Sequence, residues 1–256
     1  MLKVRVIPTL LWKGPGLVKG IGFDSWRRVG TVLPAIKVYN MRDVDELIVV
    51  DISATIEQTA PHHEAVADFS SFCFVPLTVG GGISDVEQIA RLLWAGADKI
   101  SLNSSALARP ELITEAARRF GAQCVVASID VRRHEDGLLS CFSHSGSVDT
   151  RRAPAEWACE LADRGAGEIL VTSIDRDGTM EGYDLDLVAA VAQAVPIPVI
   201  ASGGAGKYGH MVDAVKAGAS AVAAASMFHF TEQTPAEAKK ALDAVGIPVR
   251  GNFVPA

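Results

Sequence analysis

The chain carries an internal repeat that relates its first half to its second half. The segment VPLTVGGGISDVEQIARLLWAGADKISLNSS, which starts at residue 75, aligns without a gap with IPVIASGGAGKYGHMVDAVKAGASAVAAASM, which starts at residue 197. The same spacing of 122 positions matches ELIVV, from residue 46, to EILVT, from residue 168. At a spacing of 119 positions, VIPTLLWK matches VVASIDVR and places Leu11 opposite Asp130. Such a repeat indicates two copies of one supersecondary unit related by a pseudo-twofold axis.

Each half contains four short apolar runs separated by longer segments. The runs are rich in Val, Ile and Ala with little alternation, as expected for parallel strands buried on both faces. The segments 85–95 and 187–194 have the apolar spacing of amphipathic crossover helices. Eight such units in 256 residues predict a single (β/α)8 TIM barrel domain, 1–256, with an open doubly wound sheet as the competing fold. The expected strands are 4–11, 46–51, 76–79, 99–103, 124–130, 168–173, 198–202 and 221–225.

Charge and composition restrict the partners of the chain. The formal net charge is −6, which argues against nonspecific binding to nucleic acid or to anionic membranes. No run approaches the roughly 18 apolar residues of a membrane span, and no signal-peptide pattern opens the sequence, so we expect a cytoplasmic protein. The four cysteines are scattered without CxxC spacing, which argues against a zinc site or a disulfide framework. We expect neither a metal nor a cofactor.

Two glycine-rich turns follow the third and seventh expected strands, at the barrel end where such folds place their active sites. Glycine lets backbone N–H groups approach an anion closely, and the N-terminus of the next helix adds a favourable dipole. A polar strand end accompanies each turn, so we expect two phosphate sites related by the twofold. The alternative is that the glycines only make tight turns. The first site comprises Gly81, Gly82, Asn103 and Ser104, and the second comprises Gly203, Gly204 and Ser226.

Longer motifs extend over nearly the whole chain. They are TSIDRDGT from residue 172, GEIL, TVGGGI and ASGGAGK, together with Lys19 in the first loop and Phe228-His229-Phe230 near the end. Taken together they resemble the cyclase subunits of imidazole glycerol phosphate synthase. In that family a glutaminase subunit supplies ammonia, which crosses the barrel from its N-terminal face and attacks a bis-phosphorylated ribulosyl substrate. The resemblance implies that Lys19, Asp51, Thr172 and Asp177 also bind the substrate.

Four charged residues open strands at the opposite end of the expected barrel. Two acids, Glu46 and Glu168, and two bases, Arg5 and Lys99, point into this end or surround it. Charges there are costly unless they are paired, and these four can neutralise one another as a ring. The resemblance implies that the ring is an ammonia gate, and the alternative is a stabilising ion cluster. Asp98 matches a family position at the interface with the glutaminase.

The chain departs from the family at one catalytic position. The family uses two aspartates as general acid and base, at the ends of the first and fifth strands. The second is Asp130, whereas the first position is Leu11 here, the repeat partner of Asp130. Leucine cannot exchange protons, and one positioned proton-transfer group contributes about 10²–10⁴-fold in rate. We therefore expect ring closure of the histidine-pathway substrate to be weak or altered.

Leucine at this position resembles a second group, the cyclase-like subunits encoded with surface-polysaccharide genes. That resemblance implies relay of ammonia to a third protein, which converts an acetamido to an acetamidino group on a nucleotide sugar. We therefore predict the ammonia-receiving barrel subunit of a glutamine amidotransferase that serves amidination for lipopolysaccharide. One alternative is a histidine-pathway cyclase subunit that uses Asp130 with Asp51 or Asp177. Another is a non-catalytic activator of a glutaminase.

Overall fold

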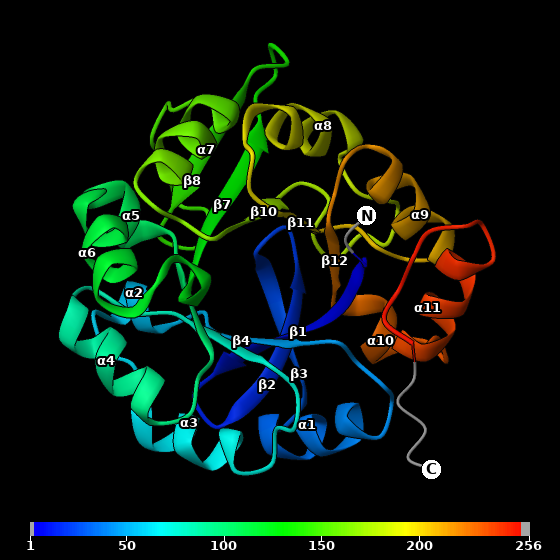
Figure 1. Ribbon diagram of the computed structural model, residues 1–256, viewed down its shortest axis with the longest axis horizontal. Helices are drawn as coiled ribbons and strands as arrows, with labels where there is room; N and C mark the ends of the chain where they lie inside the picture. Colours follow the sequence, from blue (N-terminus) through cyan, green and yellow to red (C-terminus); the bar gives the residue numbers. More distant parts are fainter. Residues whose placement is uncertain (1–2, 252–256) are drawn as a thin grey trace.

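Eight parallel strands pair side by side in a closed barrel, with helices outside them (Figure 1). The computed structural model describes residues 3–251, so residues 1–2 and 252–256 of the expected domain lie outside the described residues. The first barrel strand pairs with the last, and the two strands at the junction of the halves also pair, which excludes an open doubly wound sheet. In order around the barrel the strands are β1 (Arg5–Lys13), β4 (Leu47–Asp51), β5 (Leu77–Gly80), β6 (Lys99–Leu102), β7 (Val125–Arg133), β10 (Glu168–Ser173), β11 (Val199–Ser202) and β12 (Ala221–Ala224).

Helices cover the outside of the barrel. The expected helix 85–95 is α4, which begins after Asp85 because the carboxylate of that residue accepts the N–H of Gln88 as an N-cap. The expected helix 187–194 is α8, capped in the same way by Asp184. No helix in residues 3–251 has the length and apolar character needed to span a membrane. The outer helices are α1 (Val32–Asn40), α3 (His63–Ser70), α4 (Val86–Trp94), α6 (Glu111–Phe120), α7 (Pro154–Asp163), α8 (Leu185–Ala194), α9 (Tyr208–Lys216) and α11 (Pro235–Asp243).

Shorter helices lie in the connections between the barrel strands and the outer helices. Three of them, α2 (Ala54–Glu57), α5 (Ser104–Ala108) and α10 (Ser226–Phe230), follow directly after barrel strands. A single turn of 3₁₀ helix, η1 (Ala122–Cys124), precedes β7. Since α5 and α10 begin at Ser104 and Ser226, the two predicted phosphate-site serines occupy equivalent places in the two halves.

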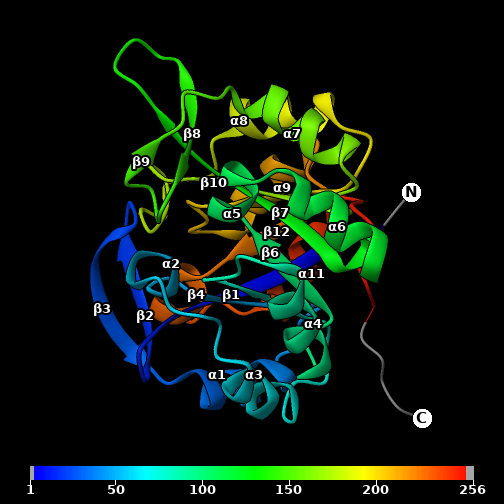
Figure 2. The same cartoon turned by 90° about the vertical axis from the view of Figure 1, so that its left-hand side faces the viewer.

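Two antiparallel hairpins extend the barrel at one end, and the sequence did not predict them. Strands β2 (Gly16–Ile21) and β3 (Asp24–Gly30) continue from β1, while β8 (Leu139–Ser143) and β9 (Val148–Asp149) continue from β7. Both hairpins lie at the same end of the barrel, on the left in Figure 2. Their parent strands are partners in the internal repeat, so the twofold extends to the hairpins.

Each hairpin is bonded to the opposite half of the barrel. The N–H of Gly22, in the β2–β3 turn, donates to the carbonyl of Asp177 over 2.9 Å. The Oγ of Ser145, in the β8–β9 turn, donates to the carbonyl of Ile52 over 3.1 Å. The two turns also approach each other, because a Cβ added to Gly146 would lie 3.2 Å from the ring of Phe23. Two hydrogen bonds, each from a hairpin turn of one half to the other half, therefore border the barrel mouth; we call them the crossed connections.

The inside of the barrel has three levels. Alternate residues of a strand face the same side, so Arg5, Ile7, Thr9 and Leu11 of β1 succeed one another along the lumen. Charged residues occupy the N-terminal end, and the C-terminal end opens into a cavity. The middle level is an apolar cluster of Ile7, Ile48, Val126, Leu170, Ile200, Ala221 and Ala223.

Candidate active site

A cavity of about 560 Å³ opens at the carboxyl ends of the barrel strands. It gathers side chains from both halves of the chain, as the twofold requires. Every residue that the sequence assigned to substrate or phosphate binding lines it, and so do Leu11 and the candidate catalytic residue. The assigned residues are Lys19, Asp51, Gly81, Gly82, Asn103, Ser104, Asp130, Thr172, Asp177, Gly203, Gly204 and Ser226.

The two glycine turns have similar backbone constraints at repeat-equivalent positions. The φ angles are 103° at Gly81 and 87° at its repeat partner Gly203, a conformation that disfavours side chains. A Cβ at Gly81 would lie 2.1 Å from the carbonyl oxygen of Asp51, and one at Gly203 would lie 2.5 Å from that of Ser173. Tight packing alone therefore accounts for glycine at these positions. A phosphate role depends on the polar groups around the turns.

Several polar atoms of the cavity wall lack a hydrogen-bond partner among the described residues. The Oγ of Ser226 is one, on a side chain that is only 5% exposed. The Oγ1 of Thr9 and the Oδ1 of Asn103 are two more. In contrast, the Oγ of Ser104 accepts the N–H of His144 over 2.9 Å. Because an unsatisfied buried polar atom is costly, these atoms are suited to a polar ligand in the cavity.

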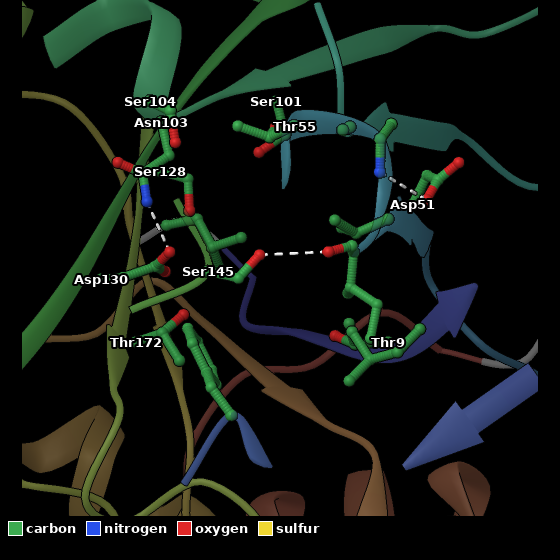
Figure 3. Close-up of a pocket in the computed structure, with 18 of the residues that line it drawn as sticks. Thr9, Asp51, Thr55, Ser101, Asn103, Ser104, Ser128, Asp130, Ser145 and Thr172 are labelled. Atoms are coloured by element: carbon green, nitrogen blue, oxygen red, sulfur yellow. Dashed lines mark hydrogen bonds between the residues drawn. The ribbon is translucent and has the colours of Figure 1, made fainter. Parts of the chain in front are cut away.

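Asp130 follows Val126 and Ser128 among the alternate residues of β7 that face the inside of the barrel. The Nδ2 of Asn103 donates to its Oδ2 over 2.5 Å, a contact drawn in Figure 3. Burial raises the pKa of Asp130 to about 7, with the charge of Asp177 acting in the same direction and hydrogen bonds from Asn103 and Ser128 opposing it. A carboxyl group that titrates near neutral pH can both donate and accept a proton, which suits general acid–base catalysis.

A buried ion pair links the first hairpin to the turn after β10. The Nζ of Lys19 lies 2.5 Å from the Oδ2 of Asp177, and the Lys19 side chain is almost completely buried. Burial raises the pKa of Asp177, and Lys19 opposes this rise without cancelling it. A buried lysine needs such a partner, because an unpaired charge in this environment is strongly destabilising. The pair therefore places a cation and a carboxylate in the cavity wall.

The wall across the cavity from Asp130 has a different character. Leu11 is half-buried there and lies in register with Val50. Asp51 lies on the same side, far from Asp130 in Figure 3, and its Oδ1 accepts the backbone N–H groups of Ser53 and Ala54 and the hydroxyl of Ser53. The position of the missing aspartate is thus apolar, and the neighbouring carboxylate is engaged at the start of α2.

The four charged residues at the N-terminal end form a closed ring. Arg5 Nη1 lies 2.9 Å from a carboxylate oxygen of Glu46 and 3.0 Å from one of Glu168. Lys99 Nζ lies 3.0 Å and 2.8 Å from the same two carboxylates. Burial alone would raise the pKa of Glu46, but Arg5 and Lys99 outweigh it and hold this pKa below its ordinary value. The two acids and the two bases of the ring therefore compensate one another's charge.

Asp98 lies outside the ring, at the surface of the same end. Its side chain is exposed, although its Oδ2 accepts the N–H of Leu77 over 2.8 Å. Arg250 approaches the ring from the C-terminal segment, with 3.8 Å between its Nη2 and Glu46 Oε1. The structure thus brings the four predicted ring residues together and leaves Asp98 accessible beside them.

Some cavity residues were missed in the sequence. Thr9 and Ser128 lie two positions before Leu11 and Asp130 on β1 and β7, and Ser101 lies two positions before Asn103, which follows β6. The period of two along a strand could have identified them. No such signal exists for the β8–β9 turn, which was not recognised as part of a hairpin. The residues that line the cavity from that turn are His144 and Ser145.

The fold and site define a twofold-repeated (β/α)8 barrel with a polar cavity at one mouth and a charged ring at the other. A model of the family described as "Histidine biosynthesis protein" matches residues 5–234, and the chain belongs to this family. The chain is 46% identical over 250 residues to the imidazole glycerol phosphate synthase subunit HisF of Gluconacetobacter diazotrophicus, which covers 98% of this chain and 97% of that protein. The resemblance to the cyclase subunits is confirmed, whereas the polysaccharide-associated group receives no support.

Ser226→Ala tests whether the Ser226 hydroxyl group, which has no hydrogen-bond partner among the described residues, binds a ligand. We expect the variant to raise the free energy of unfolding of the ligand-free protein by about 1 kcal/mol, because it removes a buried group that has no partner. Stabilisation by added inorganic phosphate should fall at the same time. Urea denaturation with and without phosphate measures both effects. The matched control, Ser104→Ala, should lower the ligand-free stability, because His144 loses its acceptor. A destabilised Ser226→Ala protein would contradict the interpretation.

The stability of Asp130→Asn relative to wild type should depend on pH. The folded-state pKa is about 7 and the unfolded value is about 3.9, so the unfolded chain loses its proton first as the pH rises. Wild type should therefore lose stability relative to the variant between about pH 4 and pH 7, and the difference should level off above that range. Urea denaturation across this range measures the difference.

Asp149→Asn provides a control of opposite sign. Hydrogen bonds from Ser140 and from the N–H of Arg151 lower the pKa of Asp149. That carboxylate stabilises the fold above its unfolded pKa and loses this effect as the pH falls. The stability of Asp149→Asn relative to wild type should therefore fall as the pH rises. A pH-independent difference for Asp130→Asn would show that its carboxyl group has an ordinary pKa.

Proposed function

We propose that this chain is the ammonia-receiving cyclase subunit of an imidazole glycerol phosphate synthase, with weak or altered activity. The proposal depends on one observation: the same barrel has a charged ring at its N-terminal mouth and a cavity at its other mouth. The cavity is lined by both glycine turns and by Asp130. Membership of the histidine biosynthesis family and the likeness to a HisF subunit support it. The partner proposed with it is a glutaminase subunit, docked at the ring and contacting Asp98.

The lumen offers ammonia a route from the ring to the cavity. Each ring carboxylate is bonded to both cations, so passage requires at least one of these ion pairs to open. The apolar middle level around Ile7 suits a small neutral molecule and disfavours ammonium and other ions, because an unpaired charge is costly there. Beyond it, the hydroxyl groups of Thr9, Ser101 and Ser128 lead toward Asp130.

The cavity suits a ligand with a phosphate group at each end. The two glycine turns belong to twofold-related strands, so a bis-phosphorylated molecule can span the mouth between them. We assign one phosphate to the Gly81–Gly82 turn with Ser104, and the other to the Gly203–Gly204 turn with Ser226. The substrate's central atoms would then face Asp130, Thr172 and the Lys19–Asp177 pair. Asp51 would contact the substrate from the opposite wall.

Sugar amidination is the second candidate function, and Leu11 is the observation that favours it. An apolar residue at this position removes a proton-transfer group, which is compatible with a barrel that only relays ammonia. The family and the HisF relative favour the histidine-pathway cyclase instead. A purely non-catalytic activator role has less support, since Asp130 keeps a pKa tuned to about 7 inside the cavity.

The test of the proposal is turnover of the family's bis-phosphorylated ribulosyl substrate with ammonium chloride as nitrogen source. We expect slow turnover by wild type, loss in Asp130→Asn, and a gain of up to about 10²-fold in Leu11→Asp, which supplies a second carboxylate across the cavity. Product formation at several substrate concentrations measures kcat and KM. A Leu11→Asp protein that neither binds nor converts this substrate would contradict the cyclase function and favour amidination.

Lys99→Met tests the gate. The variant leaves Arg5 as the one remaining ring cation, with Arg250 only near Glu46, so the ring should loosen and ammonia released by a bound glutaminase should transfer poorly. Turnover with glutamine plus glutaminase should fall by about tenfold, while turnover with ammonium chloride stays within about twofold of wild type. Lys216→Met, at an exposed site on α9, is the control. An equal loss with both nitrogen sources would indicate that the ring serves stability.

A further inference from the structure

Asp177 is a second buried carboxylate on the Asp130 side of the cavity. Strands β7 and β10 pair directly, with Asp130 opposite Thr172 in the register. The turn after β10 holds Asp177, whose N–H donates to the carbonyl of Ser173 over 3.0 Å. We propose that in this chain Asp177 acts with Asp130 as the proton-transferring pair and takes the place of the carboxylate that is missing at Leu11. The inference rests on the proposed cyclase function.

Asp51 is less suited to this role, although it is nearer to Leu11. One of its carboxylate oxygens already accepts three hydrogen bonds at the start of α2. Its strand position also alternates with that of Val50, which packs against the inner apolar cluster, so Asp51 is not part of the inward-facing row. Protonating Asp51 would weaken these three hydrogen bonds, because a neutral carboxyl group is a poorer acceptor than a carboxylate. Asp177 carries no comparable structural duty toward a helix.

Lys19 connects Asp177 to the side of the cavity where the carboxylate is missing. It follows Val18, which is the pairing partner of Leu11 between β1 and β2. From there its ammonium group reaches the Oδ2 of Asp177, and both side chains are at least 87% buried, with exposures of 1% and 13%. The pair therefore bridges β2 and the turn after β10. It holds a carboxylate in the wall of the cavity that Leu11 and Asp130 also line.

The two carboxyl groups have different neighbours. Asp130 accepts hydrogen bonds from the uncharged Asn103 and Ser128, and burial raises its pKa to about 7, so its protonated form is populated at neutral pH. Burial raises the pKa of Asp177 as well, but the Lys19 ammonium group lies 2.5 Å from its Oδ2 and opposes this rise. When two carboxyl groups line one cavity and have different neighbours, one can serve as the general acid and the other as the general base.

The proton transfers balance without any further reactant. When ammonia adds to an electrophilic carbon doubly bonded to oxygen, the nitrogen lone pair forms the C–N bond and the π electrons move to the oxygen. The nitrogen must then lose one proton, which Asp177 accepts as a carboxylate. The oxygen must gain one proton, which Asp130 donates. After the step Asp177 is protonated and Asp130 is ionised, so the net charge of the pair is unchanged.

A suppression experiment tests the inference in the full-length chain with ammonium chloride as nitrogen source. We expect Asp177→Asn to lower kcat by about 10²-fold or more, with a smaller change in KM, and to remove one limb of the pH–rate profile. Adding Leu11→Asp to this variant should return kcat to within about tenfold of the Leu11→Asp single variant. Asp175→Asn, two positions away on the exposed side of the same turn, is the matched control and should leave kcat near wild type.

A role limited to holding Lys19 gives a different pattern. Asp177→Asn would then raise KM, and Leu11→Asp could not restore the rate, because a carboxylate at position 11 does not replace the partner of Lys19. Either result would overturn the inference. Asp177→Glu keeps the carboxylate and should retain kcat within about tenfold. Since Asp177→Asn leaves a buried lysine facing an amide, the free energy of unfolding of each variant is measured alongside.

The same measurements separate this inference from the proposed function. If wild type is inactive but Leu11→Asp turns the substrate over, the cyclase site stands and the role of Asp177 is overturned. If neither protein turns the substrate over, both proposals fail. If Asp177→Asn retains the wild-type kcat, only the role of Asp177 is lost.

Discussion

Closure of the barrel by backbone hydrogen bonds is the constraint on which the rest of the molecule depends. Once β12 pairs with β1 and β10 pairs with β7, the barrel strands have no free edge, and every second side chain must face the lumen. The lumen is narrow, so its contents are decided by a few positions on each strand. Along β1 these positions change from Arg5 through Ile7 and Thr9 to Leu11. The same alternation produces the charged, apolar and hydroxyl-rich levels.

Burial of charge is handled in different ways along this lumen. At the N-terminal mouth, each carboxylate of the ring contacts two cations, so its charge is compensated within the protein. Lys19 is compensated by a single carboxylate in the cavity. Among residues 3–251 no cation acts on Asp130, and burial raises its pKa so that the group holds a proton near neutral pH. A buried charge must be compensated by an opposite charge or be neutralised by a proton. The ring follows the first course and Asp130 follows the second.

The internal repeat predicted the barrel and the two glycine turns, because it fixes which positions are equivalent. The positions of charges at strand starts and the family resemblance predicted the charged ring, and the resemblance alone predicted Lys19, Asp51, Thr172 and Asp177. The sequence did not predict the hairpins. Strands β2 and β3 read GLVKGI and DSWRRVG, which lack the alternation of a half-buried strand. Strand β2 forms because it pairs with the end of β1, and β3 forms because it pairs with β2. Leu11 lines the cavity at the expected position. However, a leucine at this position does not by itself show which substrate the cavity binds. The amidination prediction depended on that residue alone, and the relationship to known proteins favours histidine biosynthesis instead.

The crossed connections of the two hairpins have a consequence for the halves of the chain as separate pieces. Gly22 of the first half is bonded to Asp177 of the second, and Ser145 of the second half is bonded to Ile52 of the first. A half-barrel alone would expose two unpaired sheet edges and would leave its own hairpin without its anchor. If the chain were cut between β6 and β7, the two fragments would therefore reassemble. Each fragment supplies the strands that pair with the free edges of the other, and the backbone carbonyl that anchors the hairpin turn of the other.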